Sequence, residues 1–132
     1  MKVTDLRIGN KVFYNDENET PEPIIVEIGL SDLILISEGL KSCVYKPIPI
    51  TEDWLVKFGF VMHNKVNGSF CLNNYGIFLS IGLKGFNGFK DNSVSIKTML
   101  ITHDWITIDC IDNVHQLQNL YYALTGSELS VS

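Results

Sequence analysis

The chain has 132 residues and a net charge of −5, from 15 acidic and 10 basic residues. A nucleic-acid-binding module normally clusters lysine and arginine against phosphates, so with Arg7 as the only arginine we expect no nucleic-acid partner. The apolar fraction of 45% supports a core that needs no metal or disulfide. The length favours one compact domain over residues 1–132, with a strand-rich lobe at about 1–50 and an α+β lobe at about 51–132.

Residues 1–50 carry the pattern of short strands separated by turns. Gly9-Asn10 predicts a turn before a strand at 11–14, and apolar residues alternate over 24–28. Ser31-Asp32 interrupts that pattern and residues 33–36 resume it, which predicts a hairpin. With a further short strand near 43–45, these elements predict a small SH3-like lobe.

The predicted loop at 15–23 holds a local acidic patch, formed by Asp16, Glu17, Glu19 and Glu22. We expect a solvated loop here. The alternative is a patch that attracts a basic partner or a cation.

The middle of the chain predicts a short helix followed by a second, antiparallel sheet. Pro47 and Pro49 keep residues 46–50 extended. Thr51 is placed to cap a helix that buries Trp54 and ends at Gly59. Asn67-Gly68 is a hairpin signal, and apolar residues then alternate in three later segments, at 77–81, 94–96 and 106–110.

The chain closes with an amphipathic helix that we expect to pack on this sheet. Asn113 and Gln116 have the spacing of a capping box, and Gly126 is a C-cap glycine. The apolar residues recur at helical spacing: Val114, Leu117, Leu120, Tyr121 and Leu124. Together the segments predict an α+β fold.

The glycine-spaced segment 82–90 is the first candidate binding site. Phe86 and Phe89 stand between Lys84 and Lys90. Exposed aromatic side chains framed by cations suit a protein interface or stacking on a base. A phosphate loop is excluded because the GK[ST] ending is missing. The alternative is a hairpin loop whose phenylalanines fold back onto the core.

A second candidate lies on the predicted outer face of the last helix. Four neutral polar residues share one stripe: His115, Gln118, Asn119 and Tyr122. Such a stripe can bind a peptide or a small ligand through hydrogen bonds. Plain solvated surface is the alternative.

The sequence predicts neither a metal site nor a catalytic centre. Asp109 and Cys110 alternate along a predicted strand and so diverge, and His103-Asp104 has the character of a turn. No serine stands in a nucleophile elbow, and His63 lies in a polar hairpin. We therefore expect no catalytic residue, no metal and no cofactor.

The cysteines and the N-terminus indicate an intracellular setting. Cys43, Cys71 and Cys110 are odd in number and far apart, which predicts free thiols in a reducing cytoplasm. Residues 1–10 contain no apolar signal segment. No apolar run is long enough to span a bilayer, so we expect no membrane partner.

Three segments carry a resemblance: LRIGN at 6–10, KPIPITEDWLVKFGF at 46–60 and VHQLQNLYYALTG at 114–126. They resemble a family of short uncharacterised proteins from Bacteroidetes bacteria and their phages and mobile elements. The resemblance covers both predicted helices and the N-terminal turn. It implies a small accessory protein in a bacterial cell, and it implies no mechanism.

The preferred hypothesis is a non-enzymatic accessory binding protein, host-directed and acting through a protein interface. The partner is another protein or a second copy of the chain, as a homo-oligomer. The first alternative is a protein that binds and sequesters a small anionic ligand with Lys84 and Lys90. The second alternative is an unrecognised enzyme.

Overall fold

The computed structural model describes residues 3–16, 22–39, 44–64, 69–74, 77–83, 93–98, 106–109 and 111–131. The chain forms two compact units. Unit 1 comprises residues 1–49 and 113–120, and unit 2 comprises residues 50–112 and 121–132. Strands and helices occur together with two antiparallel sheets, which confirms the predicted α+β fold.

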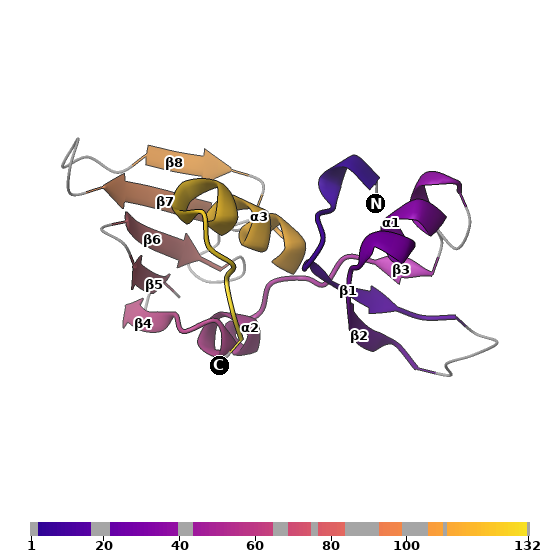
Figure 1. Ribbon diagram of the computed structural model, residues 1–132. Coiled ribbons are helices and arrows are strands. Elements are labelled where there is room, and N and C mark those ends of the chain that lie inside the picture. Colours follow the sequence, from indigo (N-terminus) through magenta and orange to yellow (C-terminus); the bar gives the residue numbers. More distant parts are fainter. Residues whose placement is uncertain are drawn as a thin grey trace. The chain divides into compact units, whose positions relative to one another are not determined.

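Unit 1 is built on a three-stranded antiparallel sheet. Strand β1 (Lys11–Tyr14) lies between β2 (Ile24–Glu27) and β3 (Tyr45–Lys46) (Figure 1). The 3-10 helix η1 (Val3–Asp5) precedes β1, and helix α1 (Leu30–Ser37) follows β2.

One face of this sheet carries the core of unit 1. The buried cluster consists of Val12, Tyr14, Ile28, Ile36 and Tyr45. The Tyr14 and Tyr45 rings meet edge to face with centroids 5.3 Å apart. The Tyr45 hydroxyl donates to Asp32 Oδ1 at 2.6 Å. Burial, together with this hydrogen bond, raises the pKa of Tyr45, so the phenol stays protonated and acts as a structural donor.

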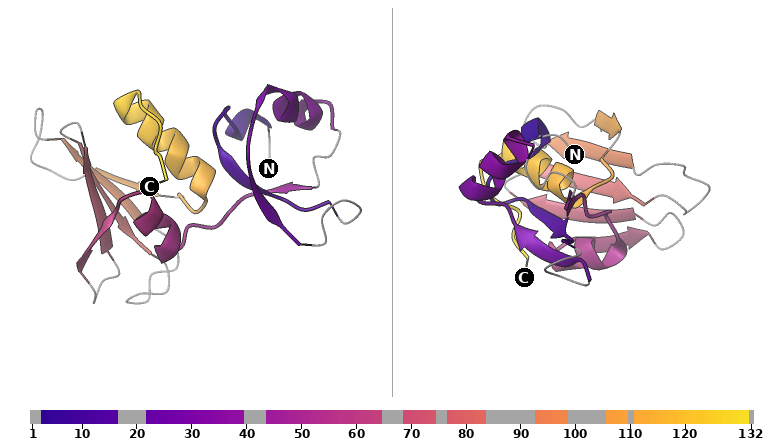
Figure 2. Two further views of the ribbon diagram at one scale, coloured as in Figure 1. Left: turned by 60° about the horizontal axis from the view of Figure 1, so that its bottom comes forward. Right: turned by 90° about the vertical axis from the view of Figure 1, so that its right-hand side faces the viewer.

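Helix α1 corrects the sequence-based prediction of a strand at 33–36. The residues there are all apolar, so their pattern fits a buried strand as well as a helix. The flanking residues decide in favour of the helix, because Asp32 Oδ2 accepts the Gly29 N–H at 2.8 Å and closes the first turn. Gly39, at φ +75°, ends it. The left view of Figure 2 shows the chain running from β2 into α1.

Unit 2 contains a five-stranded antiparallel sheet, in which each strand pairs with the next along the chain. Its strands are β4 (Val61–Asn64), β5 (Ser69–Asn74), β6 (Ile77–Gly82), β7 (Ser93–Thr98) and β8 (Ile106–Asp109). The predicted second sheet is thereby confirmed. Leu79 and Ile81 of β6 are buried, as their alternation predicts.

Helix α2 (Glu52–Lys57) leads into this sheet and begins and ends where the sequence predicts. Thr51 Oγ1 accepts the Trp54 N–H at 3.4 Å, and Gly59 follows the helix at φ +90°. Trp54 is buried, and its ring lies 5.6 Å from that of Phe58, centroid to centroid. A helix of this length depends on such packing for its stability.

Helix α3 (Val114–Thr125) is also capped as predicted. The Asn113 N–H donates to Gln116 Oε1 at 3.0 Å, and Gly126 stands at φ +73°. The helix is divided between the units, since its residues up to Leu120 belong to unit 1 and those from Tyr121 onward to unit 2. The sequence offers no sign of that division.

Candidate functional site

The predicted glycine-spaced site lies outside the described residues. Lys84, Phe86, Phe89 and Lys90 all fall in the segment 84–92 that follows β6. Its proposed role in binding therefore stays a prediction.

The polar stripe on α3 does not form an outer face. Gln118 and His115 are only 1% and 3% exposed, Asn119 is half-buried, and Tyr122 alone is exposed. The predicted position is thus wrong for His115 and Gln118. Both residues are buried rather than facing solvent.

Gln118 completes one edge of the small sheet. Strand β3 ends at Lys46, opposite Phe13 of β1. The Lys11 amide points to the same side of β1 as that of Phe13, but no strand of the described part lies beside it. Gln118 Oε1 accepts this Lys11 N–H at 2.8 Å, and Gln118 Nε2 donates to the Gly9 carbonyl at 3.3 Å. A side-chain amide therefore takes the place of a strand and satisfies a part-buried backbone donor.

Asn10 and Asn119 continue the same network through the N-terminal turn. Asn10 is fully buried; its Oδ1 accepts the Arg7 N–H at 2.7 Å, and its Nδ2 donates to Asn119 Oδ1 at 2.9 Å. Asn119 Nδ2 donates in turn to the Asp5 carbonyl at 3.0 Å. These amides hold the turn to α3.

His115 is the exception in this network. Its Nδ1 atom is buried and has no hydrogen-bond partner among the described residues. Burial lowers the pKa of His115, and the nearby Asp5 carboxylate opposes only part of that effect. The imidazole is therefore neutral at pH 7.

One sequence signal foreshadowed the burial of this stripe. The segment from Val114 to Thr125 contains no charged residue, although the solvent-facing side of a helix normally carries charge. The partners themselves could not be read from the sequence, because Gln118 contacts residues 107 and 109 positions away.

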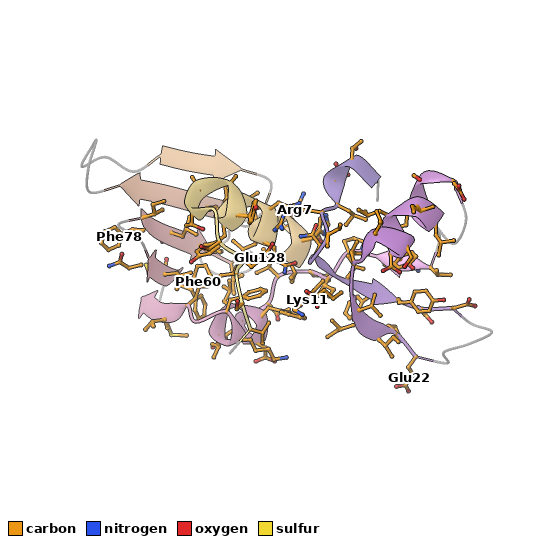
Figure 3. All side chains as sticks on the ribbon, in the orientation of Figure 1. Arg7, Lys11, Glu22, Phe60, Phe78 and Glu128 are labelled. Atoms are coloured by element: carbon orange, nitrogen blue, oxygen red, sulfur yellow. The ribbon has the colours of Figure 1, made fainter. Side chains whose placement is uncertain are left out.

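The opposite edge of the small sheet is exposed. In the part of the chain that the structure describes, no strand lies beyond β2. Ile24 and Ile25 are 46% and 49% exposed. Consecutive strand residues point to opposite faces, so β2 is uncovered on both faces at this point. The Glu22 side chain projects away from the sheet beside the start of β2 (Figure 3).

The main-chain groups along this edge follow from the register. The Ile28 N–H donates to the Asn10 carbonyl at 2.8 Å, so Ile28 and every second residue before it face β1. The main-chain groups of Ile25 and Glu27 must then point away from β1. Pro23 is also directed away from β1, but proline has no N–H to donate.

Sequence predictions about other sites are only partly covered. Within the described ranges, no three His, Cys, Asp or Glu side chains are close enough together to hold a metal ion. Cys71 is a free thiol, and the other two cysteines lie outside the described residues. None of the helices in the described part combines the length and apolar character that a bilayer crossing requires.

Comparison with protein-family models, with curated proteins and with solved structures finds no match to this chain. The candidate surface is therefore defined by its geometry alone: the open edge of β2 with Ile24, Ile25 and Glu27.

Proposed function

We propose that this chain is a non-enzymatic binding protein and that it engages a protein partner through β2 of unit 1. The observation that carries the proposal is the simultaneous exposure of Ile24 and Ile25, on opposite faces of an edge strand. Isoleucine on both faces of a strand is costly to leave in water, since full burial of an exposed side chain of this kind gains about 1.5–3 kcal/mol. Ile24 and Ile25 are about half exposed, so a partner that covers β2 recovers roughly half of this free energy for each.

Other exposed apolar residues of unit 1 support the same role. Ile8, Leu30 and Ile34 are large and exposed, and the last two are one helical turn apart on α1. Leu30 and Ile34 thus form a second exposed apolar pair in unit 1, and paired apolar exposure favours an interaction surface more than single exposed residues do.

Two residues of the polar stripe of α3 have a structural role instead. The amides of Gln118 and Asn119 make their hydrogen bonds within unit 1. No described contact favours the anionic-ligand alternative, which depends on Lys84 and Lys90. The resemblance to bacterial and phage proteins extends the proposal to a cytoplasmic accessory protein that is directed at a host protein.

Affinity capture from the native host tests the proposal. The tagged chain is compared with an Ile25→Lys variant and with a Val61→Lys variant, in which the same change is made at a 69% exposed residue of unit 2. We expect one protein to be retained saturably by the wild type and by Val61→Lys, and to be lost with Ile25→Lys. Equal retention by both variants would refute the assignment of the surface.

A further inference from the structure

We draw no further inference here: the strongest candidate, the row of small side chains that Cys71, Ser80 and Ser95 form across β5, β6 and β7 on the face of the unit 2 sheet opposite its buried residues, supports none, because nothing among the described residues shows which ligand or partner would cover it.

Discussion

The two edges of the three-stranded sheet in unit 1 differ in whether their main-chain groups have partners. On the β3 side, where the neighbouring strand stops early, Gln118 extends from α3 and bonds the Lys11 amide that the missing strand would have taken. On the β2 side, the Ile25 and Glu27 amides face outward and the isoleucine side chains are exposed. One edge is closed by a residue more than a hundred positions away, and the other is open.

This difference separates an edge that serves stability from one that can serve recognition. Leaving a buried donor unsatisfied costs about 1–3 kcal/mol, so a side chain such as that of Gln118 is expected wherever the sheet edge is buried. An exposed edge has no such requirement, because water satisfies it. An exposed edge that is also apolar, like β2, is a template for another strand.

Proline substitution at neighbouring positions of β2 should sharpen the contrast most. Val26→Pro removes the N–H that bonds to β1, and it also disturbs a side chain packed on the core. We expect a loss of about 3 kcal/mol in the free energy of unfolding, from an unsatisfied carbonyl and lost packing. Ile25→Pro should cost about 1 kcal/mol or less. Chemical denaturation of both variants measures the difference, and equal losses would show that the inferred parity is wrong.

Removal of the Gln118 amide should open the closed edge. Gln118→Ala leaves the Lys11 N–H and the Gly9 carbonyl without their partners, for which we expect a loss of about 2–3 kcal/mol in unfolding free energy. The matched control is Gln116→Ala on the same helix, which removes one capping contact and should cost about 1 kcal/mol. A Gln118→Ala loss no larger than the control would mean that the closed edge adds little to stability.

The buried histidine should make the closed side of unit 1 sensitive to acid. The pKa of His115 is lowered by burial, so below about pH 6.5 the unfolded chain binds a proton that the folded chain does not. Stability should therefore fall as the pH drops through this range, by at most about 1.4 kcal/mol per pH unit. The fall should end once the pH is below the folded-state pKa.

The free energy of unfolding is measured against pH for the wild type and for a His115→Gln variant. The difference between the two profiles isolates the contribution of His115 from that of the carboxylates. A difference between the two profiles that is flat from pH 7 to pH 5 would show that His115 is solvated.

The smallest effect on stability is expected at the open edge. Ile24→Ser and Ile25→Ser replace exposed side chains, so each should change the free energy of unfolding by about 0.5 kcal/mol or less. Val12→Ser, on the same sheet but fully buried, should cost several times more. Thermal melting of the three variants provides the comparison. A large loss at Ile24 or Ile25 would place β2 inside a core.

Local signals allowed much of the fold to be predicted from the sequence. The Thr51 cap, the Asn113–Gln116 contact and the glycines that end α2 and α3 act within a few residues, and the structure has them as expected. Helix α1 was missed because four consecutive apolar residues fit two periodicities, and a single Asp32 contact decides between them.

The surfaces were harder to predict because they depend on distant contacts. His115 and Gln118 have the composition of a solvated stripe, but both are buried, and Gln118 bonds residues of the N-terminal turn and β1 that lie far away in the sequence. The exposure of Ile24 and Ile25 likewise follows from the strand order, which places β2 at an edge. Alternation predicted the strand itself but not its neighbours.

Amide hydrogen exchange in the free protein tests the contrast between the two edges most directly. At a dilution that excludes self-association, we predict slow exchange for the Lys11 amide, which Gln118 bonds, and for the Val26 amide, which faces β1. The Ile25 and Glu27 amides alternate on the same strand with amides that face β1. They should exchange near the rate of an unstructured chain. Protection of Ile25 and Glu27 equal to that of Val26 would contradict an open β2 edge, and with it the proposed docking site.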